Sequence, residues 1–316
     1  MLFKNSLKIL FSNFGLAWKS IVYFLIVGLI SGLGIYLSLI PVVELLSENG
    51  YFASFVELYT DFITSLNLAG FFESVSLLVD EIFAFVIDNI THMWWNFALV
   101  LIIFFFSYFC FSNMVMMAHC NSLHLNMGSM ARQGFFLSYK QVFAKNFKFQ
   151  LVNFLVVLPI RALTIVLFLQ LLELFKYSWV VSLIAIFIIV LCYLLIMSLR
   201  IAVFSAWAPT MIVMDYGVWK SLKVSLKISF RRFGRVFSGA MGITLCLICI
   251  NFFCGLFTFM VALIISVPAT YLLLSVFGMV VAYEGQGMRY YVDVYNVVTP
   301  LKKERSDKLK EMKYII

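Results

Sequence analysis

Charged residues are scarce in this sequence. Asp, Glu, Lys and Arg make up 12% of the 316 residues, and hydrophobic residues make up 64%. A soluble protein carries about twice that charged fraction. Apolar runs of about twenty residues recur along the chain, which is the length that crosses a bilayer. The composition therefore excludes an ordinary soluble fold and predicts an all-α integral membrane protein.

Catalytic signatures are also absent. The chain has no Gly-x-Ser-x-Gly elbow, no P-loop, no His-Glu-x-x-His motif and no dinucleotide fingerprint, and it has only three histidines. We therefore expect no enzymatic activity, no cofactor and no catalytic residues. This places the protein among non-enzymatic membrane components or transporters.

Metal-binding and redox sites are not expected either. Cys246-x-x-Cys249 lies within a predicted span, where a thiolate is energetically expensive. His119 and His124 are five residues apart, which places them on different faces of a helix. Five of the six cysteines fall inside predicted spans, and none lies in the long segment 44–92, so a disulfide framework is not expected.

Six segments are long and apolar enough to cross a membrane. We expect one polytopic domain with a cytoplasmic tail at 285–316 and spans at 21–43, 93–118, 149–170, 178–200, 237–263 and 265–283. The first span follows a basic amphipathic start and has no small-residue cleavage site after it, which favours a retained helix over a signal peptide. The last two spans nearly adjoin, so Pro268 is expected near a tight outer turn.

The distribution of charge orients these spans. The segment 44–92 has eight acidic residues and no Lys or Arg, whereas basic residues cluster before the first span, between later spans and in the tail. Because cytoplasmic loops carry the basic residues, both termini are predicted to lie in the cytoplasm. The predicted location of the protein is the cytoplasmic membrane. The net charge of +8 then needs no nucleic acid, and the predicted partners are anionic lipid headgroups. Two apolar stripes in 44–92 predict a helical hairpin resting on the outer face.

Three cytoplasmic stretches resemble one another. Each has Ser, an apolar residue and Lys, and closes on Asn or Ser followed by Phe, beginning at Ser6, Ser138 and Ser221. The serines are 132 and 83 residues apart, and the difference of 49 equals the length of 44–92. This favours three parallel repeats, each an interfacial helix followed by a membrane hairpin, over chance matches.

The clearest interfacial helix is predicted at 217–233. An apolar stripe runs from Trp219 to Phe233 at spacings of three and four, and a basic face lies beside it, formed by Lys220, Lys223, Lys227 and Arg231. A helix with one apolar and one basic face lies in the headgroup plane. The alternative is a basic loop whose apolar stripe packs on the bundle, and both can hold together.

Two features inside the spans suggest further roles. Gly28-x-x-x-Gly32, with Gly34, permits close helix packing, which we expect within the chain. Arg161 lies near the middle of the third span, two residues after Pro159, where a kink or break is expected. A charge at this depth predicts an anion or lipid site, because an intramembrane Arg needs a partner. The alternative is that Arg161 extends to an interface.

The run from Ala208-Pro209 through Asp215 and Gly217 to Ser225 resembles a known pattern. It is similar to the multi-pass membrane domain fused to some glycerophosphodiester phosphodiesterases and to related bacterial membrane proteins of unknown function. The specific match covers about thirty residues. The phosphodiesterase catalytic domain has no counterpart here. The resemblance therefore implies a membrane module and transfers no catalytic residue.

Two functions remain open from the sequence. The favoured one is a non-enzymatic scaffold, accessory or lipid-associated membrane component. The alternative is a transporter or permease for a small or lipid-like anion that uses Arg161. Polar residues at mid-depth are few, chiefly Arg161 with Asn153, Gln170 and Asn251, and this sparseness favours the first.

Overall fold

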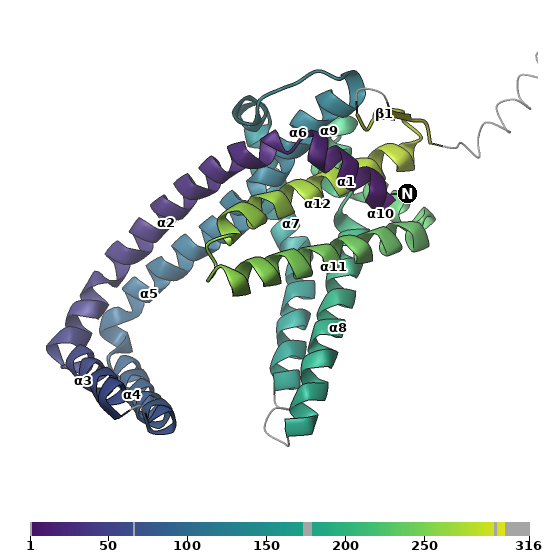
Figure 1. Ribbon diagram of the computed structural model, residues 1–316. Coiled ribbons are helices and arrows are strands. Elements are labelled where there is room, and N and C mark those ends of the chain that lie inside the picture. Colours follow the sequence, from purple (N-terminus) through teal and green to yellow (C-terminus); the bar gives the residue numbers. More distant parts are fainter. Residues whose placement is uncertain (1, 66, 173–178, 294–295, 301–316) are drawn as a thin grey trace, which may run out of the picture. The chain divides into compact units, whose positions relative to one another are not determined.

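The computed structural model describes residues 2–65, 67–172, 179–293 and 296–300. Within these ranges the chain is almost entirely α-helical, with one short pair of strands (Figure 1). The described residues contain six helical segments that are long and apolar enough to cross a membrane. The protein is thus an all-α, multi-pass integral membrane protein, as predicted.

The elements follow one another along the chain with short connections. They are α1 (Leu2–Ser12), α2 (Gly15–Glu48), α3 (Tyr51–Ser65), α4 (Leu68–Asp88), α5 (Ile90–Phe105), the π-helix η1 (Phe106–Phe111), α6 (Ser112–Ser129), α7 (Phe135–Leu172), α8 (Trp179–Phe204), α9 (Trp207–Val213), α10 (Val218–Arg231), α11 (Phe233–Phe257), α12 (Leu263–Gln286), β1 (Tyr290–Tyr291) and β2 (Val297–Val298). Residues up to Phe24 and from Ser112 onward form one compact unit, and Leu25–Phe111 forms a second.

In the second unit, α3 and α4 form an antiparallel pair. Tyr51 at the start of α3 packs on Phe85 near the end of α4, and Phe62 packs on Phe71 with ring centroids 4.7 Å apart. The predicted helical hairpin in 44–92 is therefore present as a hairpin. Much of its apolar surface is exposed, because the two helices cover only one side of each other.

The helices α2 and α5 meet at a position other than the predicted glycine pair. The hydroxyl oxygens of Ser31 and Ser107 are 2.5 Å apart, and a Cβ at Gly34 would lie 3.2 Å from the Ile103 side chain. No atom of the described chain lies within 4 Å of the corresponding position at Gly28 or Gly32. Within the second unit these two glycines therefore make no close helix contact, and their packing within the chain stays a prediction.

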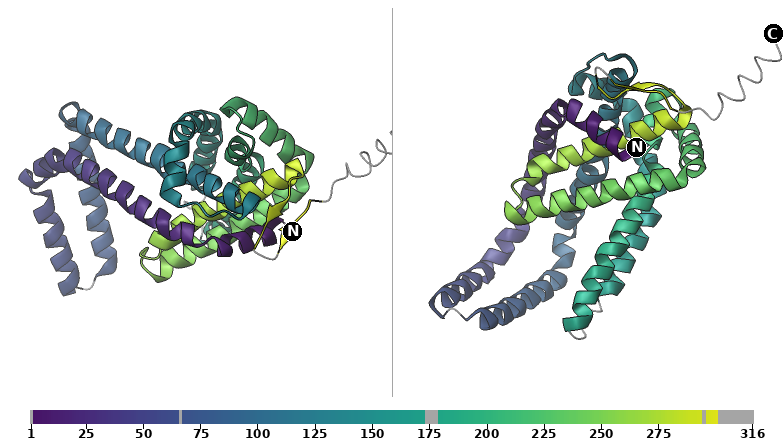
Figure 2. Two further views of the ribbon diagram at one scale, coloured as in Figure 1. Left: turned by 90° about the horizontal axis from the view of Figure 1, so that it is seen from above. Right: turned by 45° about the vertical axis from the view of Figure 1, so that its right-hand side comes forward.

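In the first unit, α12 is the most enclosed of the membrane helices. Its most apolar stretch is 61% buried, whereas that of every other candidate span is at most 22% buried. It contacts α1, α6, α9 and α11, and both views of Figure 2 show α1 and α12 running side by side. The helix α12 therefore forms the centre of this unit.

Close approach to α12 depends on glycine. A Cβ at Gly278 would lie 2.2 Å from the carbonyl oxygen of Ser205, and one at Gly239 would lie 3.1 Å from the Phe277 ring. Small residues permit such contacts between membrane helices, where packing rather than the hydrophobic effect drives association. The backbone of α12 therefore lies directly against the junction of α8 and α9.

Polar side chains connect the other helices of this unit. From α7, the Asn146 amide donates to the Met114 carbonyl of α6 at 2.6 Å, and the Gln150 amide donates to the Asn113 carbonyl at 3.0 Å. The Trp207 indole donates to the Val218 carbonyl at 2.9 Å, joining α9 to the start of α10. Such bonds fix helix positions where water does not compete.

Three local expectations concern prolines and the end of a helix. The helix α7 runs through Pro159 without interruption, so no break lies beside Arg161. The fifth membrane helix ends at Phe257, six residues before the predicted end of that span. Pro268 lies inside α12, shortly after the turn formed by 258–262, in which Phe259 and Met260 have positive φ.

The three proposed repeats start from serines in similar environments. Ser6, Ser138 and Ser221 each have 0% exposed surface. The helices that contain them differ, because α1 and α10 end before the following span, whereas α7 continues into it. Duplication remains a prediction.

Candidate functional site

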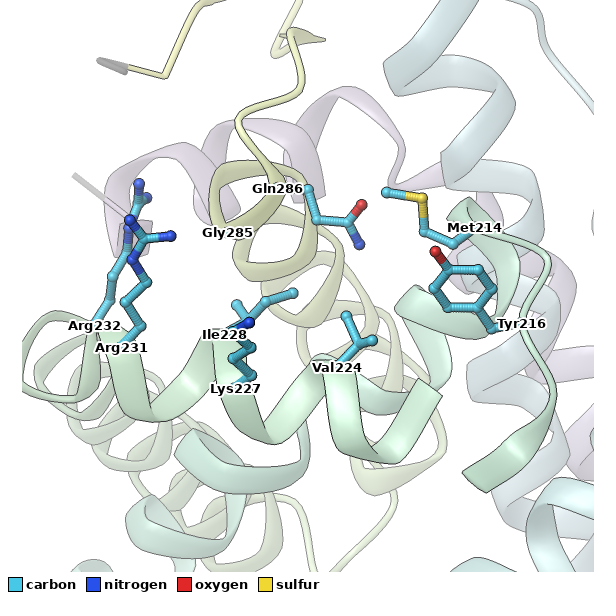
Figure 3. A pocket seen from close by; sticks show the side chains of 9 residues that line it. All are labelled: Met214, Tyr216, Val224, Lys227, Ile228, Arg231, Arg232, Gly285 and Gln286. Atoms are coloured by element: carbon cyan, nitrogen blue, oxygen red, sulfur yellow. The ribbon is translucent and has the colours of Figure 1, made fainter. Parts of the chain in front are cut away.

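A pocket lies between α10 and the C-terminal end of α12 (Figure 3). Its volume is about 230 Å³. The loop between α9 and α10 closes one side. Its lining residues are Met214, Tyr216, Val224, Lys227, Ile228, Arg231, Arg232, Gly285 and Gln286.

The helix α10 has three faces with different side chains, and one of them anchors it in the bundle. Its buried face carries Ser221, Ser225 and Ser229 at spacings of four, together with Leu222 and Ile228. Small side chains at this spacing let the helix approach the bundle closely. One further face exposes aromatic side chains, and the other is basic. The helix is therefore anchored in the bundle while two faces stay accessible.

The back wall of the pocket is a tight contact between α10 and α12. A Cβ at Gly285 would lie 2.2 Å from the Ile228 side chain. The Arg232 guanidinium donates to the Glu284 carbonyl at 2.9 Å. A cation at this position also interacts favourably with the negative end of the α12 dipole. The end of α10 is thus held against the last turn of α12.

A second network fixes that last turn from the opposite direction. The Tyr290 hydroxyl donates to the Glu284 carboxylate at 3.0 Å and accepts from the Asn5 amide at 3.0 Å. Burial and the nearby Glu284 carboxylate raise the pKa of Tyr290 above its usual value, so the hydroxyl keeps its proton as a donor. Gly287 ends α12 in the left-handed conformation. Gln286 therefore sits on a fixed backbone.

Gln286 is the unusual polar residue of the pocket. Both its amide nitrogen and its amide oxygen are buried, and neither has a hydrogen-bond partner in the described structure. Figure 3 shows the amide extending from the end of α12 toward the side chains of Met214 and Tyr216, which also line the pocket. Leaving a buried polar group unsatisfied costs about 1–3 kcal/mol. A ligand that bonds to both amide atoms would remove this cost.

The charged side chains that line the pocket all have one sign. Lys227, Arg231 and Arg232 line it, and no lining residue carries a carboxylate. The two acidic residues that adjoin lining residues are engaged elsewhere, because Glu284 accepts from the Tyr290 hydroxyl and Asp215 is paired with Lys145 of α7. This pairing lowers the pKa of Asp215. The pocket therefore favours an anion.

The loop before α10 adds an aromatic contact at the edge of the pocket. The Lys220 ammonium lies 3.9 Å from the centroid of the Tyr216 ring. A cation at this distance over an aromatic face is attracted by the ring. The ring of Tyr216, a lining residue, therefore lies beside the first turn of α10.

The predicted site residues separate into three groups. Lys227 and Arg231 line the pocket, whereas Lys220 and Lys223 are exposed on α10 outside its lining. Arg161 is partly buried on α7 and is not a lining residue. The structure thus brings part of the basic face to a cavity and leaves Arg161 elsewhere.

Sequence reasoning missed three lining residues, namely Tyr216, Arg232 and Gln286. Gln286 lies 55 residues beyond Arg231 and was assigned to the cytoplasmic tail. The available signal was the polar run Glu284-Gly-Gln-Gly at the end of an otherwise apolar span. Polar residues at that depth suggest function, but their partner is not readable from the sequence.

The other weak candidates gain no support. The described residues contain no group of three or more His, Cys, Asp or Glu that could hold a metal ion. The His124 ring nitrogen lies 2.7 Å from the Tyr283 hydroxyl, and buried His119 packs on Phe135. The described cysteines, which include Cys246 and Cys249, are free thiols. The two histidines therefore have structural contacts inside the bundle.

Comparison with known proteins does not add to this description. No protein-family model, curated protein or solved structure matches the chain.

Proposed function

We propose that this protein is a non-enzymatic, lipid-associated component of the cytoplasmic membrane. In this proposal α10 lies at the cytoplasmic surface and binds anionic headgroups through Lys220, Lys223, Lys227 and Arg231. The observation that carries the proposal is the arrangement of faces on α10. One face is buried in the bundle, while a basic face and an aromatic face remain exposed.

The exposed aromatic residues support an interfacial position. Trp219 is 61% exposed and Phe230 is 63% exposed, and both lie beside the basic face. Aromatic rings favour the depth of the headgroups, and each Lys or Arg near an anionic surface adds about 1 kcal/mol. A loop that only packed on the bundle would bury these rings. The surface instead suits the boundary between lipid and water.

The proposed topology has both termini in the cytoplasm. It rests on the basic residues of α1, α10 and the loops on that side, and on the eight acidic residues of 44–92. The resemblance of 208–225 to the multi-pass domain of some glycerophosphodiester phosphodiesterases supports a membrane module whose own activity is undefined, and it transfers no catalytic residue. The resemblance does not identify a substrate.

The competing proposal is a transporter for a small or lipid-like anion that uses Arg161. It is supported by the partly buried position of Arg161 on α7. Arg161 is outside the lining of the basic pocket, so the two proposals depend on different residues. Anion uptake into proteoliposomes that is lost in Arg161→Gln would favour the transporter.

The test of lipid association uses the full chain purified in detergent. Equal amounts of phosphatidylglycerol and phosphatidylcholine are added, and the lipid that stays bound is measured by mass spectrometry. We expect wild type to retain phosphatidylglycerol preferentially. The double variant Lys220→Gln/Lys223→Gln should lose most of this preference, because two charges near the surface contribute about 2 kcal/mol.

The matched control is Lys4→Gln/Lys8→Gln. It removes the same charge from exposed positions of α1, on the same proposed side of the membrane. The control should keep a larger share of the preference than the α10 variant. If the two variants behave alike, or if wild type shows no preference for the anionic lipid, the proposed role of α10 is wrong.

A further inference from the structure

We infer that the pocket between α10 and α12 binds one phosphomonoester group, with Lys227 and Arg231 neutralising its charge and Gln286 bonding to its oxygens. The inference rests on the proposed association with anionic lipids and names the headgroup chemistry. The same group occurs at the end of a lipid such as phosphatidic acid and in free compounds such as glycerol 3-phosphate.

The charge of the pocket favours a monoester over a diester. Three cationic side chains line it, and none of the lining residues is acidic. A phosphomonoester carries a charge of about −1.5 to −2 near neutral pH, whereas a diester such as phosphatidylglycerol carries about −1. Arg232 already donates to the Glu284 carbonyl, but a guanidinium has five N–H donors and can also face a ligand.

Gln286 supplies the chemical discrimination. Its amide nitrogen donates hydrogen bonds and its oxygen accepts them, and both atoms are buried without a partner in the described chain. A phosphate oxygen accepts from the amide nitrogen. A monoester also carries a P–O–H group for part of the time at neutral pH, because its second pKa is about 6, and this hydroxyl donates to the amide oxygen. A diester lacks the P–O–H group, so its phosphate cannot donate to the amide oxygen.

The shape of the pocket fits a small headgroup. Its volume of about 230 Å³ lies below the roughly 300–1,000 Å³ of sites for drug-sized ligands. The contact of Gly285 with Ile228 closes the back, while Lys227 and Arg231 are exposed at the opening. A phosphate can therefore enter while the rest of a lipid stays outside.

The experiment measures binding to the full-length protein in detergent, with short-chain phosphatidic acid and phosphatidylglycerol as probes. We expect phosphatidic acid to bind one saturable site at least tenfold more tightly than phosphatidylglycerol. Gln286→Leu should bring the two lipids within threefold of each other. Gln141→Leu, an exposed glutamine outside the pocket, is the matched control and should keep the wild-type ratio.

A second variant distinguishes loss of binding from loss of the fold. Lys227→Gln removes a charge from an exposed position, so the fold should persist while phosphatidic acid binds at least fivefold more weakly. A competition arm identifies the source of the phosphate. Displacement of phosphatidic acid by glycerol 3-phosphate assigns the site to a free phosphomonoester, whereas binding that resists displacement assigns it to the lipid.

Two results would overturn the inference. One is equal affinity of wild type for the two lipids, and the other is an unchanged ratio in Gln286→Leu. Neither result affects the proposed association of α10 with anionic lipid, which depends on the Lys220→Gln/Lys223→Gln comparison. The Lys220→Gln/Lys223→Gln variant could lose the lipid preference while Gln286→Leu keeps the wild-type ratio. That outcome would support the general proposal and contradict the specific site.

Discussion

The contact between α12 and the α8–α9 junction predicts a strong effect of one methyl group. In Gly278→Ala, the new Cβ would lie 2.2 Å from the Ser205 carbonyl oxygen and 3.0 Å from Cγ of Pro209. Real Cβ atoms essentially never approach within 3.0 Å of another heavy atom. The Ser205 oxygen belongs to the main chain, so a rotamer change cannot relieve the contact. The two backbones must separate by about 1 Å.

Two opposing effects determine the size of the loss. Alanine in place of glycine favours the helix by about 1 kcal/mol. Overpacking a tight contact typically costs about 1–3 kcal/mol and occasionally more, and here the obstacle is the rigid backbone. We therefore expect Gly278→Ala to lower the free energy of unfolding by about 1–2 kcal/mol.

The assay is thermal unfolding of the purified protein in detergent, followed by tryptophan fluorescence. Gly255→Ala is the matched control, because Gly255 lies in α11 and no atom of the described chain lies within 4 Å of its Cβ position. The control should unfold at the wild-type temperature or above it. If Gly278→Ala unfolds at the same temperature as Gly255→Ala, the proposed backbone contact does not limit the packing of α12.

Three other predictions follow from local contacts. Gly285→Ala should lower the melting temperature and Ile228→Ala should restore part of the loss, because that clash is with a side chain; a double variant no better than Gly285→Ala would contradict this. In a background without native cysteines, an impermeant thiol reagent on intact cells should label Ser54→Cys and not Lys140→Cys, both exposed positions, and the reverse pattern would refute the topology. The lowered pKa of Asp215 means that its ion pair stabilises the fold at neutral pH and is lost as the pH falls below 3.8 through the folded-state pKa. Asp215→Asn should therefore melt below wild type at pH 7 and converge with it in acid, and a constant gap would speak against the pairing.

The membrane helices were predictable because their signal is local. A run of about twenty apolar residues must bond its own backbone in lipid, whichever helices it later contacts. Ends were less predictable, since hydropathy does not distinguish a membrane helix from an apolar turn. Phe259 and Met260 look like span residues, yet they form the turn between α11 and α12 with positive φ.

Helix contacts were the part that the sequence did not reveal. Serine is a residue type that is mostly exposed in proteins, but Ser225 and Ser229 belong to the buried face of α10. Gly28 and Gly32 match a packing motif, while the close contact of α2 occurs at Gly34. A pattern shows where close approach is sterically possible, and only the partner helix decides whether it occurs.

Only part of the candidate pocket was predictable, because the sequence shows the residues of one helix but not the helix that packs against it. Lys227 and Arg231 belong to a periodic basic face that the sequence shows directly. Gln286 joins them only because Gly285 admits Ile228 and Arg232 holds the last turn of α12. These contacts connect residues more than fifty positions apart, so no local pattern could predict the cavity.

The pairing of α1 with the end of α12 imposes an order on biosynthesis. Asn5 and Tyr290 are bonded although the ribosome makes them 285 residues apart. The helix α1 therefore lacks this partner until nearly the whole chain has been synthesised. During that interval, its buried positions Ile9 and Leu10 lack the surface that later covers them. The apolar face of α1 is thus uncovered for most of translation, because α11 and α12, on which it packs, are made last among the helices.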